Sequence, residues 1–289
     1  MTTRFGTGWF CWLALLGMVP VAAAEPPREN FSPTAAQAVL VNAMQHHGEW
    51  TSVHAAEYLI QAGRGHLVPS VFRPQADTAT APFRIGVWRV LAQAEETAAE
   101  RTRYVEQIRA ALLDTNGPDQ LHALESLAKL NIPLASEEER ALVRELASND
   151  EYAGQAFALW RLEQEASSPE RSNKLVAVLR SADPVRRLRA AFVLGQHGSH
   201  PPEIRAAIGT TLAHEPHDSI AYPYLAIAAG GEPLLALAHD ADHPSAQALA
   251  VRELALQGQT LPALKISADS PLALKMVAAF ARLRAGDKP

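Results

Sequence analysis

The stretch of sequence that decides the fold is Asp183–Gly195, which reads DPVRRLRAAFVLG. Asp183 is a favourable helix N-cap residue, and Pro184 occupies the first helical position, where its missing N–H costs no hydrogen bond. Apolar residues then recur at helical spacing. Gly195 or Gly198 can end the helix, because glycine accepts the left-handed conformation that often follows a helix. The stretch therefore predicts one amphipathic helix that needs neighbours to cover its apolar face.

The same stretch resembles the second helix of a HEAT repeat, whose family pattern runs roughly D-P-x-V-R-x-x-A-A-x-A-L-G. The resemblance extends over residues 169–198 and returns over 242–285, which begins DHPSAQALAVRELALQG. It implies stacked helix pairs, with Asp183 and Arg187 making contacts between neighbouring repeats. Ankyrin and tetratricopeptide repeats are the competing interpretations. The chain lacks the T-P-L-H motif of the first and the aromatic and proline pattern of the second.

Helix-start signals recur at a regular interval along the chain. Corresponding starts fall at Pro118, Glu151, Pro184, Ser219, Pro244 and Pro271, which gives intervals of 33, 33, 35, 25 and 27 residues. β-branched residues are sparse, and no sustained alternation of apolar and polar residues predicts a strand. We therefore expect an all-α fold, a HEAT-like α-solenoid of about eight antiparallel helix pairs within residues 32–289.

Individual helix boundaries follow from capping residues. Ser32 with Pro33 is expected to open the first helix, and Ser136 with Glu139 forms a capping box for another. Asp150 is expected to cap a helix over residues 151–164.

The first residues have a different character. Arg4 precedes an apolar run over residues 9–21, and Ala22-Ala23-Ala24 then supplies an A-x-A cleavage site. These three regions are typical of a bacterial secretory signal peptide, whereas a membrane anchor needs about 20 apolar residues. We therefore expect residues 1–24 to be a signal peptide, residues 25–31 a linker, and the mature protein periplasmic or secreted.

Cleavage after Ala24 would remove Arg4 and Cys11, so that the net charge falls from −5 to −6 and no cysteine remains. Helix packing would then stabilise the fold without a disulfide, although the destination is oxidising. A net negative chain argues against nucleic-acid binding, which needs a basic face. No later stretch is apolar enough to span a membrane, so we expect no span after signal cleavage.

The most unusual local chemistry lies in the N-terminal block. His54 and Glu57 share one helix face, as do Arg84 and Trp88 on a later helix. If these helices are neighbours, the faces form one polar patch suited to a sugar or a carboxylate, with Trp88 for stacking and Arg84 as a bidentate donor. His54 and Glu57 would be its acid or base. The alternative is structural: the tryptophans belong to the core, and Glu57 pairs with an arginine of another repeat.

Histidines and aspartates also gather at predicted helix junctions near the C-terminal side. Such residues could hold Zn²⁺ or another divalent ion, although spacing within a loop fixes no geometry. Histidines that cap helix C-termini or are solvated are the alternative. The candidate metal ligands are His214, His217, Asp218, His239, Asp242 and His243.

The sequence offers no motif for nucleophilic catalysis and no phosphate-binding glycine loop, so we expect no cofactor. The first hypothesis is an interaction scaffold whose concave face binds a protein or an extended ligand. The second is a protein that binds or hydrolyses a small carbohydrate or carboxylate at the N-terminal patch. The candidate binding residues are His54, Glu57, Tyr58, Arg84, Trp88, Tyr152, Arg161 and Arg186.

Overall fold

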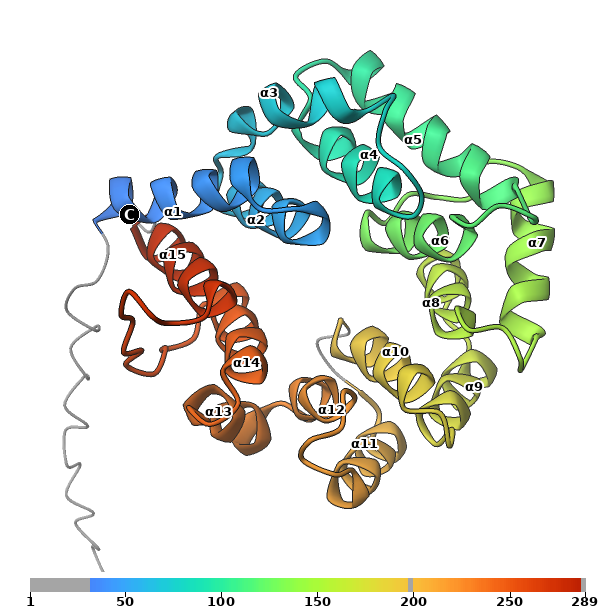
Figure 1. Ribbon diagram of the computed structural model, residues 1–289. Coiled ribbons are helices and arrows are strands. Elements are labelled where there is room, and N and C mark those ends of the chain that lie inside the picture. Colours follow the sequence, from blue (N-terminus) through green and yellow to red (C-terminus); the bar gives the residue numbers. More distant parts are fainter. Residues whose placement is uncertain (1–31, 197–199, 287–289) are drawn as a thin grey trace, which may run out of the picture.

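The computed structural model describes residues 32–196 and 200–286, and within them the chain is entirely helical (Figure 1). The all-α prediction is therefore confirmed for the described part. The predicted signal peptide over residues 1–24 and the linker over 25–31 lie outside the described residues. No described helix combines the length and the apolar character that crossing a membrane requires.

Helices alternate between the inside and the outside of the molecule. The inner helices are α2 (Glu49–Gln61), α4 (Phe83–Ala94), α6 (Gln120–Lys129), α8 (Gln155–Glu165), α10 (Pro184–Gly195), α12 (Tyr222–Ala229) and α14 (Pro244–Leu256). The outer helices are α1 (Pro33–His46), α3 (Pro69–Phe72), α5 (Ala98–Leu113), α7 (Glu137–Ser148), α9 (Pro169–Leu179), α11 (Pro202–His214) and α13 (Gly231–His239). The last helix is α15 (Leu272–Gly286), and short 3₁₀ turns, Gly65–Leu67 and Arg73–Gln75, flank α3.

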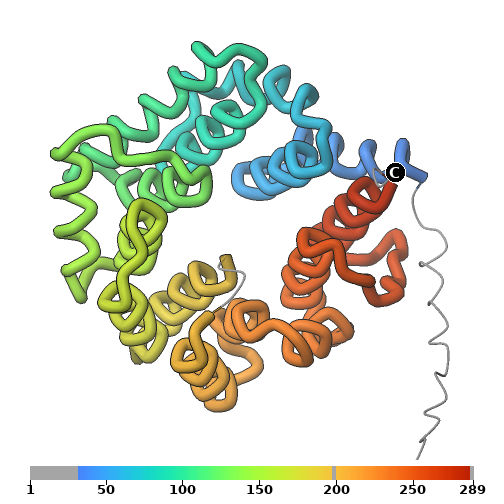
Figure 2. The backbone as a smooth tube through the Cα atoms, turned by 180° about the vertical axis from the view of Figure 1, so that it is seen from behind, coloured from blue at the N-terminus to red at the C-terminus, as the bar shows by residue number. Residues whose placement is uncertain are grey.

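The helices form a closed ring (Figure 2). Each inner helix contacts the next inner helix from α2 to α14, and α15 then packs against α14, α1 and α2. In the described chain α1 to α14 make seven successive pairs, and α15 closes the circle without a following partner. An open array would leave its first and last helices apart, so closure is the feature that the sequence pattern did not predict.

Two apolar clusters form the core. One runs from α4 to α12, and the other joins α1 to α4 with α12 to α15, so that Leu40 and Phe280, from opposite ends of the chain, share one interior. Both side chains are fully buried. The two termini of the ring are therefore held together by hydrophobic burial and not only by polar contacts.

Three of the predicted helix starts are confirmed by their capping bonds, whereas the helices predicted to start at Pro118 and Ser219 begin at Gln120 and Tyr222. The hydroxyl of Ser136 accepts a hydrogen bond from the Glu139 amide at 3.1 Å, and Asp183 Oδ1 accepts one from the Val185 amide at 2.9 Å. Ser32 does the same for α1. These bonds satisfy amides that have no partner inside their helix.

The predicted start of a helix at Glu151 is wrong, because α8 begins at Gln155. Asn149 Oδ1 accepts a hydrogen bond from the Glu151 amide at 2.9 Å, and the Tyr152 amide donates to the Asn149 carbonyl at 3.1 Å. This turn takes up residues 150–154. Asp150 instead accepts a hydrogen bond from the Gln155 side chain at 2.8 Å.

An arginine four residues after the N-cap recurs at several outer and inner helix starts. Arg101, Arg140, Arg187 and Arg205 each donate from Nη1 to a carbonyl of the preceding turn, at 2.6, 2.6, 2.8 and 2.7 Å respectively. Arg187 also binds both carboxylate oxygens of Glu215 at 2.8 Å, which ties α10 to the turn between α11 and α12. The arginine thus satisfies turn carbonyls that no helix bond can reach.

Gly86 lies at a close contact between α2 and α4. A Cβ at this position would lie 2.9 Å from a Val53 methyl and 3.0 Å from the Trp50 ring. We expect Gly86→Ala to lower the free energy of unfolding by about 1–3 kcal/mol through overpacking. The control is Gly209→Ala on exposed α11, where nothing lies within 4 Å; it should raise stability by about 0.5–1 kcal/mol. Urea unfolding measures both, and equal effects would contradict the close packing.

Candidate functional site

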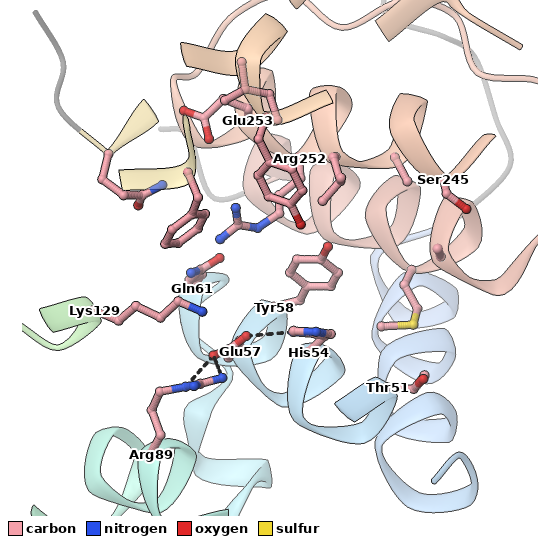
Figure 3. A pocket seen from close by; sticks show the side chains of 18 of the residues that line it. Thr51, His54, Glu57, Tyr58, Gln61, Arg89, Lys129, Ser245, Arg252 and Glu253 are labelled. Carbon is pink, nitrogen blue, oxygen red and sulfur yellow. Dashed lines mark hydrogen bonds and ion pairs between the residues drawn. The ribbon is translucent and has the colours of Figure 1, made fainter. Parts of the chain in front are cut away.

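A central cavity of about 410 Å³ lies where the inner helices meet α15 (Figure 3). Its wall combines amide, hydroxyl, carboxylate and cationic groups with apolar and aromatic surface. The polar lining residues are Thr51, His54, Glu57, Tyr58, Gln61, Arg89, Gln93, Lys129, Gln196, Tyr224, Ser245, Arg252 and Glu253. They come from α2, α4, α6, α12 and α14 together with Gln196 at the end of α10.

Three side chains that bond to one another in sequence, His54, Glu57 and Arg89, form one side of this cavity. His54 Nδ1 lies 3.1 Å from Glu57 Oε2, and Glu57 Oε1 accepts a hydrogen bond from Arg89 Nε at 2.9 Å and forms an ion pair with Arg89 Nη2 at 2.8 Å. Arg89 is only 1% exposed and also donates to the Ser126 hydroxyl at 3.2 Å. The helical spacing of α2 puts His54 and Glu57 on one face, and neighbouring α4 supplies the guanidinium.

The charge state of Glu57 follows from these contacts. Burial alone would raise the pKa of its carboxyl group, but Arg89, the hydrogen bond from His54 and the nearby Lys129 together hold the pKa well below its usual range. An ionised Glu57 only accepts hydrogen bonds, so His54 must carry its proton on Nδ1. Since the His54 side chain is 51% exposed, its other nitrogen, Nε2, is the atom left for a ligand.

A second His-x-x-Glu pair stands beside the first. On α6, Glu125 pairs with Lys129 at 2.6 Å, and His122 Nδ1 lies 3.4 Å from the other Glu125 oxygen. Burial would raise the pKa of Glu125, but Lys129, His122 and Arg89 together lower it. The Trp50 ring connects the two pairs, with His122 at 5.3 Å and Arg89 at 5.9 Å.

Two of the predicted binding residues lie away from the cavity. Arg84 Nε donates to Asp119 Oδ2 at 2.6 Å, and Trp88 Nε1 donates to the Ala76 carbonyl at 2.9 Å. The Arg84 guanidinium also lies over the Trp88 ring at 5.6 Å. Helix α4 therefore turns these two side chains toward its neighbours, and the next residue, Arg89, is the one that reaches Glu57.

Two of the other candidates, Arg161 and Arg186, also bond within the protein. Arg161 is buried and donates to Gln164 at 2.7 Å, while Arg186 donates to Gln155 Oε1 at 2.7 Å and to the Asp150 carbonyl. Burial raises the pKa of Tyr152 to about 12. None of the three lines the central cavity, whereas His54, Glu57 and Tyr58 do.

The candidate metal ligands are dispersed in the structure. His214 Nδ1 lies 2.8 Å from the Thr210 carbonyl, His217 stacks on Tyr222 at 4.1 Å, and His243 pairs with Asp240 at 2.8 Å. Across residues 32–196 and 200–286, no three His, Cys, Asp or Glu side chains gather as metal ligands. Of these residues, His214 fits the capping alternative, because it lies in the last turn of α11 and contacts a carbonyl there.

Sequence patterns gave no signal for several residues of the cavity. Gln61, Lys129, Tyr224 and Arg252 come from four different helices, α2, α6, α12 and α14, and they meet only in the folded ring. Each is unremarkable in its own helix. Arg89 could have been found, because it follows Trp88 and lies one helix away from Glu57.

Comparison with protein-family models gives no match for this chain. Comparison with curated protein sequences also gives no match.

Proposed function

We propose that this protein binds a small polar ligand, a carbohydrate or a carboxylate, in the central cavity. The observation that carries the proposal is the convergence of polar side chains from α2, α4, α6, α12 and α14 around one cavity of about 410 Å³. Ligand cavities usually measure about 300–1,000 Å³ and combine apolar walls with a few placed polar groups. Aromatic Tyr58, Phe192 and Tyr224 supply the apolar surface on which a sugar ring can pack.

The charge state of Glu57 favours binding over glycoside hydrolysis. A glycosidase needs one carboxyl group with a raised pKa as its proton donor. Arg89 instead keeps Glu57 ionised, and Lys129 does the same for Glu125. Glu57 therefore serves to orient His54 toward the ligand.

The scaffold hypothesis uses the same inner helices, with a protein or extended ligand on the concave face. Closure of the ring by α15 supports the small ligand, because the inner face then surrounds a limited volume. We also propose that the helix pairs are HEAT-like repeats. The recurrent arginine at helix starts and the Arg187–Glu215 link between successive pairs support this assignment.

We further propose that the protein is exported to the periplasm or secreted. The support comes from the A-x-A cleavage site at Ala22–Ala24 after an apolar run.

A thermal-shift panel tests the binding function. We expect the purified protein to be stabilised by at least one neutral sugar, uronic acid or hydroxy acid, by about 2.7 kcal/mol when the ligand is at a hundred times its Kd. Ser245→Trp should abolish the shift, because Ser245 lies on the cavity wall (Figure 3). The matched control is Asn173→Trp on the exposed surface of α9, which should keep the shift. If no compound of the panel shifts the melting temperature, the small-ligand proposal is wrong.

A further inference from the structure

The cation at Arg252 differs from the other cations of the cavity. Arg89 is paired with Glu57 and Lys129 with Glu125. Arg252 lines the same cavity from α14 (Figure 3), yet it has no hydrogen bond or ion pair with any described residue. The adjacent Glu253 accepts a hydrogen bond from Gln257 at 2.9 Å instead. The cavity thus offers one guanidinium whose five donors are available to a ligand.

Two phenol groups line the cavity together with this guanidinium. Tyr58 projects from α2, where its ring stacks on Phe280 at 4.9 Å, and Tyr224 projects from α12. Figure 3 shows the Tyr58 hydroxyl directed toward the side of the cavity that holds Arg252. Burial raises the pKa of both tyrosines, and the Arg252 charge acts against that rise in each case. All three side chains line the same cavity, and both phenols remain protonated donors at neutral pH.

The cavity wall also contains a hydrogen-bond acceptor without a partner in the described part of the chain. Gln61 lines the cavity one turn after Tyr58, and its Oε1 is buried without a hydrogen-bond partner among the described residues. A buried polar atom without a partner costs about 1–3 kcal/mol, so a ligand that donates a hydrogen bond to it gains that energy. Around Arg252 the protein thus presents donors for an anion and, next to them, an acceptor for a hydroxyl group.

We propose that the ligand is a monoanionic sugar acid, such as a uronic acid, whose carboxylate binds Arg252 between the hydroxyls of Tyr58 and Tyr224. This inference rests on the proposed function of the cavity. The planar guanidinium matches a carboxylate in a bidentate arrangement. A ring hydroxyl donates to Gln61 Oε1, and His54 Nε2 supplies a second polar contact. A phosphate dianion is disfavoured, because Arg89 and Lys129 are already neutralised by Glu57 and Glu125.

Isothermal titration calorimetry of the full chain tests this proposal with matched probes. D-Glucuronate and D-galacturonate are compared with D-glucose and D-galactose, which have the same ring hydroxyls without the carboxylate. We expect at least one acid to bind about 10- to 100-fold more tightly than its neutral counterpart, as befits one charged hydrogen-bonding pair. D-Glucose 6-phosphate should bind more weakly than the preferred acid.

Variants show which residues cause the preference for the acid over the neutral sugar. Arg252→Gln should remove the preference for the acid, and Tyr224→Phe should weaken acid binding several-fold without affecting the neutral sugar. Arg103→Gln is the control, because Arg103 lies exposed on outer α5 and pairs there with Asp77. If acid and neutral sugar bind equally and Arg252→Gln changes neither, the anion assignment is wrong while the cavity function stands. Tighter binding of the phosphate also overturns the assignment. If no probe binds, the anion assignment is wrong, and the thermal-shift panel decides separately on the cavity function.

Discussion

Glu57→Gln is expected to lower the free energy of unfolding by about 3–5 kcal/mol, the usual cost of breaking a buried ion pair. The cost arises because Arg89, the partner of Glu57, stays charged and buried. Arg89 is 1% exposed and would keep its charge with only the Ser126 hydroxyl at 3.2 Å and the more distant Glu125 to stabilise it. Chemical denaturation in urea measures the loss. A change below about 1 kcal/mol would show that the pair is not buried in solution.

A double variant separates the ion pair from the packing. Arg89→Met combined with Glu57→Gln removes both charges, and we expect it to cost less than the sum of the two single changes. The control is Glu137→Gln, since Glu137 pairs with Arg140 in an exposed position and should therefore contribute little. Additive single and double effects would contradict the direct pairing of Glu57 with Arg89.

The same pair predicts a dependence of stability on pH. The pKa of Glu57 is lowered in the folded protein from a reference value of 4.5, so its stabilisation is complete above that pH and is lost as the pH falls toward the folded pKa. In acid the free energy of unfolding of the Glu57→Gln variant should therefore fall less steeply, by up to about 1.4 kcal/mol per pH unit. Equal slopes between pH 4.5 and about 3 would contradict an ionised, paired Glu57.

Sequence patterns predicted those parts of the molecule that depend on neighbouring residues in the chain. Asp183 and Ser136 cap the helices that their positions indicated, because capping needs only residues two or three positions away. The prediction that His54 and Glu57 share one helix face also depended only on residues close together in the chain, and it is confirmed. At Asp150 the prediction failed, since Asn149 offered the backbone a competing turn.

The cavity could be predicted only in part, because it depends on ring closure. Tyr58 and Arg252 are 194 residues apart (252 − 58) and face the same space only because α15 packs against both α14 and α2. A helical repeat pattern fixes how each pair contacts the next, but the small rotation accumulated per pair decides whether the ends meet. That rotation comes from side-chain packing at every interface, which a period of 33 residues does not encode.

Phe280→Ala tests the closure itself, and it is expected to lower the free energy of unfolding by about 3–5 kcal/mol. Phe280 is fully buried on α15, and its ring stacks on Tyr58 of α2 with centroids 4.9 Å apart and planes 19° apart. The loss of stability therefore arises at the contact between α15 and α2, which joins the two ends of the chain and is called the seam below. Leu235→Ala, at a side chain that is 44% exposed, should cost far less. A cost below about 1 kcal/mol would mean that α15 does not close the ring.

A second comparison distinguishes the seam from the core in general. Phe72 is as fully buried as Phe280 but belongs to α3, away from the contact between α15 and α2. Phe72→Ala should lose similar stability while the ring stays closed, so any ligand-induced thermal shift should persist. Phe280→Ala also removes the support behind Tyr58, and it should weaken ligand binding together with stability. Equal effects of both variants on binding would mean that the cavity responds to overall stability and does not depend on the seam.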